Sequence, residues 1–373
     1  MEPGPIRDVA GRLAAELKAF ATPGPRMVDE IECAASVLLA IVAGHLLGAR
    51  NISWAAFSGY MVMRGHVAES LRRGLLRIVG TVVGAILAVA FVETAGTGPF
   101  ETAPALALVG GAMLYAALTS KSSYAWLFVG LTFAMIVMGQ VEHPAQPLHA
   151  FAVSRVVEVF AGTAACVLVS LVSTLSLRRR WPGPRRPDLT SAGWRPEAAR
   201  HAGQGALALA LLPLVHLAWP APQLAQAAIA IMAVMVVPVG GIGASALQPV
   251  TLRILWRIAG CVVGASFAAS ILLISHGSEG VLLPAALIGV MIGRHIENGP
   301  TSMTYAGTQF TLAALVTLVP DNYAAPDLRA GWERLAGTLV GITLLEPVLL
   351  GWHFLAPRRP AGTGAQRSEP GDI

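Results

Sequence analysis

The sequence predicts an all-α protein, a polytopic transmembrane helix bundle of about twelve spans built as two parallel six-helix repeats. Three observations predict it: the composition, the spacing of apolar runs and a motif that returns in both halves. Only 13% of the 373 residues are charged and 55% are hydrophobic, whereas soluble globular domains carry about 25% charged residues. This composition excludes an ordinary soluble enzyme, a disordered chain and a small disulfide scaffold, which leaves an integral membrane protein.

Twelve apolar runs supply the expected spans, and turn-forming sequences such as Gly98-Pro99 and Gly299-Pro300 separate them. The second run has only about twelve residues, which rise about 18 Å and fall short of a hydrocarbon core of about 30 Å. We therefore expect it to be tilted, broken or buried among its neighbours. The runs cover residues 30–48, 52–63, 74–93, 103–119, 123–140, 151–177, 199–218, 222–240, 254–275, 281–296, 301–319 and 331–355.

Lysine and arginine are distributed as the positive-inside rule requires. With the N-terminus in the cytoplasm, twenty of the 26 basic residues fall on the cytoplasmic side, and only Arg50 and Arg329 fall on the other. Both termini are therefore expected inside. Because no apolar segment precedes a cleavage site near the N-terminus, we expect no cleaved signal peptide. The expected regions are a cytoplasmic tail (1–27), a first six-span half (28–177), an Arg/Pro-rich cytoplasmic linker (178–198), a second six-span half (199–356) and a cytoplasmic tail (357–373).

The basic linker, the cysteines and the absence of enzyme motifs exclude further classes of function. The Arg-rich stretch 178–186 lies between two spans, which favours an orientation signal that touches anionic lipid over a nucleic-acid site. The three cysteines all lie in apolar runs, which argues against a disulfide framework or a zinc site. The chain has no P-loop, G-x-S-x-G, H-E-x-x-H or C-x-x-C motif, so we expect no enzyme activity, catalytic residue, cofactor or metal.

One motif recurs, an arginine followed by small residues three, four and seven positions later. Copies begin at Arg77, Arg257 and Arg334, and a degenerate copy begins at Val159 with Arg155 one turn earlier. These positions share one helix face, and small residues there let a second helix approach closely in lipid. The predicted helix-packing residues are Gly80, Gly84, Gly162, Gly260, Gly264, Gly337 and Gly341.

Spacing shows which copies correspond. Arg77 and Arg257 are 180 residues apart, and Tyr124 and Tyr305 are 181 apart. Six spans is an even number, so the two halves share one orientation. The two arginines have two interpretations: anchors at the end of a packing face, or cations lining a central path that bind an anionic substrate. An arginine inside a span needs a partner or water in either case.

Further polar residues are paired between the halves. Glu158 and Glu333 each precede the first position of a motif copy and lie near Arg155 and Arg334. They are either members of ion pairs or carboxylates that carry a proton when burial raises their pKa. Tyr124 and Tyr305 are either interfacial anchors or contacts for a substrate ring. Other polar residues inside the spans have no counterpart in the other half. Glu32, His45 and Glu346 are candidate functional residues, and Gln309 and His295 are expected to form interhelix hydrogen bonds.

The stretch Arg77-Ile-Val-Gly-Thr-Val-Val-Gly after Trp54, followed by Arg155-Val-Val-Glu-Val-Phe-Ala-Gly, resembles the fusaric-acid-resistance (FUSC-like) family of the aromatic acid exporter group. The resemblance implies efflux of small organic anions, such as aromatic carboxylic acids, across a bacterial inner membrane, driven by proton motive force. The chain departs from many members because a short basic linker replaces the large cytoplasmic domain between the halves.

Three other functions remain open: an organic-anion channel, a major-facilitator-type carrier and a membrane scaffold that transports nothing. The expected partners are membrane lipid and a small organic anion, but not nucleic acid. A periplasmic adaptor or a second copy of the chain remains an open alternative.

Overall fold

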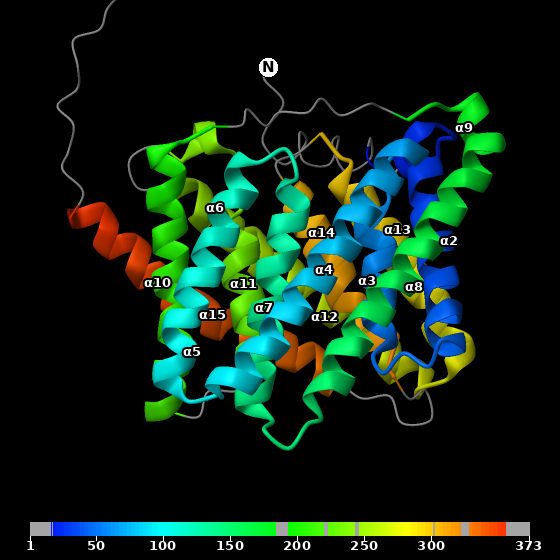
Figure 1. Ribbon diagram of the computed structural model, residues 1–373. Coiled ribbons are helices and arrows are strands. Elements are labelled where there is room, and N and C mark those ends of the chain that lie inside the picture. Colours follow the sequence, from blue (N-terminus) through cyan, green and yellow to red (C-terminus); the bar gives the residue numbers. More distant parts are fainter. Residues whose placement is uncertain are drawn as a thin grey trace, which may run out of the picture.

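We describe the protein from a computed structural model, in which residues 16, 18–183, 193–219, 223–242, 246–300, 303–321 and 328–355 are placed. Across these residues the chain is helical, with no strand (Figure 1). The all-α prediction is therefore confirmed. The tails before residue 16 and after residue 355, and linker residues 184–192, lie outside the described residues.

Each of the twelve expected runs coincides with helical structure. The first half contains α2 (Pro25–Leu46), α3 (Ile52–Val62), α4 (Val67–Ala95), α5 (Pro99–Ala105) joined by a π-helical turn (Leu106–Gly110) to α6 (Gly111–Thr119), α7 (Ser123–Glu142), α8 (Leu148–Leu175) and the short α9 (Leu177–Arg180). The second half contains α10 (Pro196–Ala218), α11 (Leu224–Met235), a 3₁₀ turn (Val239–Gly241), α12 (Leu247–Ser275), α13 (Glu279–Glu297), α14 (Thr304–Leu318) and α15 (Arg329–Leu355).

Eight of these segments, within the described residues, are long and apolar enough to cross a membrane. The second expected run is indeed short: α3 has 11 residues, is followed by Arg64 and packs between α2 and α8. Its counterpart α11 has 12 residues, shorter than the expected 222–240. Pro238 follows α11, and a proline disfavours helical backbone in the residue before it. Short helices enclosed by longer ones satisfy their end groups inside the protein rather than in lipid.

The two halves repeat the same packing arrangement. In the first half α4 packs on α7, and α8 packs on α2 and α3; in the second, α12 packs on α14, and α15 packs on α10 and α11. Contacts between the halves also come in matched pairs, with α7 on α11 and α3 on α14 near the centre. At the periphery α2 packs on α13 and α5 packs on α10. The bundle is therefore a pseudo-symmetric pair of parallel six-helix repeats, as the sequence predicts.

The outward surface of the bundle is apolar. On α4 the exposed side chains include Val79, Val83 and Ile86, and on α8 they include Phe160 and Val172. Exposed apolar surface of this extent is unfavourable in water but matches the acyl chains of a bilayer. The protein is a multi-pass membrane protein in contact with lipid.

The motif glycines lie where helices approach most closely. A β-carbon at Gly80 would lie 2.5 Å from the carbonyl oxygen of Ala125, and one at Gly84 would lie 2.5 Å from that of Val129. Gly260 and Gly264 meet the backbone of α14 in the same way, at Ala306 and Phe310. Gly162 faces the carbonyl of Ala55 on α3, while Gly337 and Gly341 face those of Gln223 and Ala227 on and before α11. All seven glycines thus allow helix contacts that a side chain would prevent.

This packing predicts a stability difference between two alanine substitutions. Gly84→Ala should lower the free energy of unfolding by about 1–3 kcal/mol, because the added methyl group overlaps backbone that has no room to move. Gly203→Ala on α10 is the matched control, because nothing lies within 4 Å of its added methyl group and alanine favours the helix. Thermal unfolding in detergent measures both. Equal unfolding midpoints for the two variants would show that the close contact between α4 and α7 does not contribute to stability.

Candidate functional site

A cavity of about 640 Å³ lies between the two halves. Its walls come from α3, α4, α7 and α8 of the first half and from α11, α12, α14 and α15 of the second. Arg72 and Lys121 are exposed at the end where α4 and α7 begin, whereas Arg155 and Arg334 are buried at the other end. The volume falls within the range of about 300–1,000 Å³ that is typical of small-molecule sites.

Two arginine–tyrosine pairs face this cavity, one from each half. Arg77 Nη1 donates a hydrogen bond to the Tyr124 hydroxyl at 2.9 Å, and Arg257 Nη1 donates to the Tyr305 hydroxyl at 3.0 Å. The four residues that the sequence pairs by spacing therefore line a single cavity. The structure places them together, whereas the repeat alone identifies only their equivalence.

The guanidinium of a second arginine lies over the ring of each tyrosine. The Arg73 guanidinium lies 3.7 Å from the centre of the Tyr124 ring, and Arg253 lies 4.1 Å from that of Tyr305. Both arginines are also fixed by a backbone carbonyl, Arg73 by that of Met61 at 3.0 Å and Arg253 by that of Ala233 at 3.2 Å. Each tyrosine hydroxyl is thus held in a cationic environment by an arrangement that is repeated in the two halves.

The cavity carries a large excess of positive charge. Nine of its described lining residues are arginine or lysine and one, Glu69, is acidic. Arg77 and Arg257 are only 2% and 1% exposed. Among the described residues no carboxylate forms a salt bridge with either of them or with Arg73, Arg253 or Arg334. The Nε atoms of Arg77, Arg257 and Arg334, and Nη2 of Arg257, are buried and unpaired in the described structure. These N–H groups are buried donors without an acceptor in the described structure.

Arg155 and Glu158 form a buried ion pair at the deep end of the cavity. Arg155 Nη2 lies 2.9 Å from a Glu158 carboxylate oxygen, and the same carboxylate accepts hydrogen bonds from the Ser154 hydroxyl at 2.6 Å and the Asn51 backbone N–H at 3.0 Å. Arg155 also hydrogen-bonds the Asn51 side chain and lies 5.0 Å from the Trp54 ring. Glu158 itself is fully buried.

Glu333 and Arg334 do not reproduce this pair, although the sequence matches them. The Glu333 side chain is 36% exposed and bonds Arg329 at 2.6 Å, whereas Arg334 turns inward and donates to Gln309 Oε1 at 3.2 Å. Arg155 and Glu158 are three residues apart and share a helix face, whereas Glu333 and Arg334 are consecutive and point about 100° apart, so the acid lies outward and the arginine inward. Gln309 forms the interhelix hydrogen bond that the sequence predicts.

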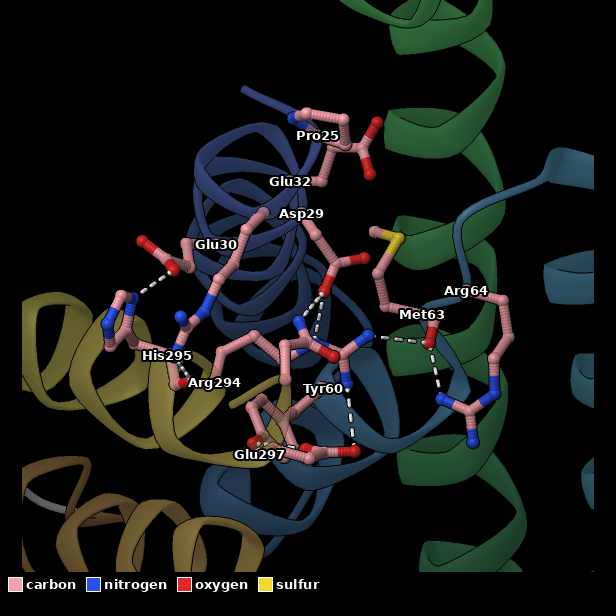
Figure 2. A network of polar contacts seen from close by, with 12 residues as sticks. Pro25, Asp29, Glu30, Glu32, Tyr60, Met63, Arg64, Arg294, His295 and Glu297 are labelled. Carbon is pink, nitrogen blue, oxygen red and sulfur yellow. Dashed lines mark hydrogen bonds and ion pairs between the residues drawn. The ribbon is translucent and has the colours of Figure 1, made fainter. Parts of the chain in front are cut away.

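A second polar cluster joins α2 of the first half to α13 of the second (Figure 2). Arg294 Nε lies 2.5 Å from Asp29 Oδ2, Nη1 lies 3.2 Å from Glu297 Oε1, and Nη2 donates to the Met63 carbonyl at 3.2 Å. Figure 2 shows Asp29, Tyr60 and Glu297 converging on this guanidinium, and the Tyr60 hydroxyl donates to Glu297 at 2.7 Å. Arg294 is 2% exposed, so its charge is matched almost entirely inside the protein.

The cluster continues at its two flanks. His295 Nδ1 lies 2.7 Å from Glu30 Oε1, which is the interhelix bond expected of His295. Arg178 on α9 lies 2.5 Å from Glu32 Oε2. The sequence indicates Glu32 and His295 as separate candidates. It does not indicate that Asp29, Arg178, Arg294 and Glu297 belong to one polar cluster with them. The available signal was the presence of three acids, Asp29, Glu30 and Glu32, at the start of an otherwise apolar segment. No group of histidine, cysteine or acidic residues in the described chain is placed to hold a metal.

An apolar helical bundle with a cationic cavity between its halves defines a polytopic membrane protein suited to anionic ligands. The sequence profile of the fusaric acid resistance protein-like family matches residues 39–169 and 206–345, one stretch in each half, and the chain belongs to this family. The family and the relative below support a role in membrane transport.

Among curated proteins, the chain is similar to the p-hydroxybenzoic acid efflux pump subunit AaeB of Musicola paradisiaca (strain Ech703). The two are 25% identical over 159 residues, which cover 40% of this chain and 24% of that protein. The match thus spans about a quarter of the relative's length. No solved structure matches the chain.

Proposed function

We propose that the protein exports small organic anions, such as aromatic carboxylic acids, across the bacterial inner membrane, driven by proton motive force. The observation that carries this proposal is the pair of buried arginines, Arg77 and Arg257, each bound to a tyrosine and both facing one cavity. Membership of the family and the printed function of the relative, efflux of p-hydroxybenzoic acid, support the same substrate class.

The cavity offers the chemical groups that an aromatic carboxylate requires. Arginine N–H groups and a tyrosine hydroxyl donate charge-assisted hydrogen bonds to the carboxylate, and these bonds are stronger inside a protein than in water. Phe128, whose ring centre lies 4.1 Å from the Arg77 guanidinium, supplies an aromatic wall beside the cation. Leu131 and Leu312 add apolar surface from the two halves.

We assign proton coupling to Glu158. Its carboxylate is fully buried and bound to Arg155, which lines the cavity. A proton taken up by Glu158 would remove the counter-charge of Arg155 and change the net charge of the cavity wall, which would link proton binding to anion binding. Glu333 lacks this connection because it is exposed and paired with Arg329.

The expected orientation places both termini in the cytoplasm, so the end of the cavity near Arg72 and Lys121 faces the cytoplasm and receives substrate there. The relative's name describes a pump subunit, which supports a partner for this chain, either a periplasmic adaptor or a second copy. Membership of the fusaric acid resistance protein-like family disfavours the major-facilitator-type alternative.

The test is transport by the purified protein in liposomes. We expect labelled p-hydroxybenzoate to accumulate against its gradient when the liposome lumen is more acidic than the bath, because proton exit then drives anion entry. Accumulation should stop when a protonophore collapses that gradient. Downhill current that ignores the pH gradient would identify a channel instead. An absence of any flux, from protein whose folding is verified, would favour the scaffold.

Glu158→Gln should separate coupling from transport. We expect this variant to lose pH-driven accumulation while it still exchanges labelled for unlabelled anion at equal pH, because glutamine keeps the hydrogen bonds but carries no titratable proton. Glu333→Gln is the matched control and should accumulate anion as the unmodified protein does. If Glu158→Gln accumulates normally, the Arg155–Glu158 pair is only structural.

A further inference from the structure

The cationic cavity contains more uncompensated charge than one carboxylate can neutralise. Arg77 and Arg257 come from different halves, and each has at least one buried N–H group without an acceptor in the described structure. Arg334, 7% exposed, adds a third guanidinium with an unpaired Nε, since its described hydrogen bond is to the neutral Gln309. Buried cations are costly unless paired and hydrogen-bonded. A monocarboxylate bound at one arginine would leave the other uncompensated.

The two halves offer the same set of groups to a carboxylate. Each consists of an arginine donating to a tyrosine hydroxyl, with a second arginine over the tyrosine ring. Since the same groups are provided twice in one cavity, a ligand with two anionic groups satisfies both at once. Such a ligand loses its freedom of translation and rotation only once for two sets of contacts.

Apolar side chains from both halves also line the cavity. Phe57, Phe128 and Leu131 line the cavity from the first half, and Leu312 lines it from the second. A flat hydrocarbon ring that carries two carboxylates offers an apolar surface to these side chains and two anions to the arginines.

We infer that the cavity binds an aromatic dicarboxylate, with one carboxylate at Arg77 and Tyr124 and the other at Arg257 and Tyr305. This inference rests on the proposed function and narrows its substrate class from monoanions to dianions. One dianion binds per chain and bridges the two repeats. The competing occupancy is two monocarboxylates, one in each half.

Calorimetric titration of the full chain in detergent distinguishes these cases. The ligands are benzoate and its three dicarboxylate relatives, phthalate, isophthalate and terephthalate, whose carboxylates differ in separation. We expect at least one dicarboxylate to bind at least about tenfold more tightly than benzoate, with one ligand per chain. The inference is overturned if none of the three binds more tightly than benzoate, or if two benzoates bind per chain with equal affinity.

Variants then assign the two carboxylates to the two halves. Arg257→Gln should reduce the affinity of the preferred dicarboxylate to that of benzoate, and Arg77→Gln, in the other half, should do the same. Arg329→Gln, at an exposed surface pair, should leave every affinity unchanged. A thermal unfolding midpoint confirms that each variant is folded, and the ligand series on the unmodified protein decides the inference without them. If benzoate binds and no dicarboxylate is preferred, only this inference fails. If none of the four acids binds, the proposed function fails as well.

Discussion

Replacing Arg77 and Arg257 together by glutamine is expected to weaken the binding of p-hydroxybenzoate about 100-fold. The arginine that binds the carboxylate donates a charge-assisted hydrogen bond worth about 1.5–3 kcal/mol, and the double replacement removes this bond from both halves. A tenfold change in affinity corresponds to about 1.4 kcal/mol. Glutamine keeps a donor and much of the length of the side chain but removes the charge. Calorimetric titration of the purified double variant Arg77→Gln/Arg257→Gln measures the change.

Stability provides the control for this experiment. Arg77 and Arg257 are buried without a carboxylate partner in the described structure, so neutralising them removes a desolvation cost rather than a salt bridge. The unfolding midpoint of the double variant should therefore equal or exceed that of the unmodified protein. Unchanged affinity in a stable double variant would make the two arginines structural anchors.

The second large effect concerns the junction between α2 and α13. Replacing Arg294 by methionine should lower the free energy of unfolding by about 3–5 kcal/mol, the range observed when one partner of a buried ion pair is removed. Glu297 would remain buried without its ion-pair partner, and Asp29 would keep only Arg178, at 3.2 Å, of its ion-pair partners in the described structure. The Met63 carbonyl would lose one of its two donors. Thermal unfolding in detergent reports the loss.

Two further variants show whether the charge pair itself is responsible. Arg329→Met breaks an ion pair whose arginine is 80% exposed, and such surface pairs contribute about 0–1 kcal/mol. The triple variant Arg294→Met/Asp29→Asn/Glu297→Gln should recover most of the stability, because no unpaired charge is left behind. If Arg294→Met is as stable as Arg329→Met, the cluster does not hold the two halves together.

Hydropathy and repeat spacing predicted the bundle because both depend on local sequence. Each apolar run became helical, and the run at 52–63 is as short as its residue count requires. The offsets of 180 and 181 residues correctly paired Arg77 with Arg257 and Tyr124 with Tyr305, since equivalent positions in two parallel repeats occupy equivalent places in the fold. The glycines of the motif followed from the same helical periodicity.

Hydropathy and repeat spacing do not predict which way a side chain points around its helix, or which distant residues form ion pairs. Glu333 and Arg334 are adjacent in the sequence but point in different directions around α15. Glu333 points outward and bonds Arg329, whereas Arg334 points inward and bonds Gln309. The contact between Asp29 and Arg294 joins residues 265 positions apart. Within the described residues no ion pair repeats it at the matching junction of α10 with α5, so no periodicity indicates it. At the equivalent place in the second half, His201 hydrogen-bonds the Met235 carbonyl instead.

The central claim is that the cavity between the halves selects ligands by negative charge. Two ligands with the same ring test it most directly: p-hydroxybenzoate and p-hydroxybenzyl alcohol, in which an uncharged hydroxymethyl group replaces the carboxylate. Titration of the unmodified protein should give saturable binding of the acid, weakened by added salt as screening predicts, and at least about tenfold weaker binding of the alcohol. Equal affinity for the two compounds would contradict the account, because the arginines would then contribute nothing to recognition.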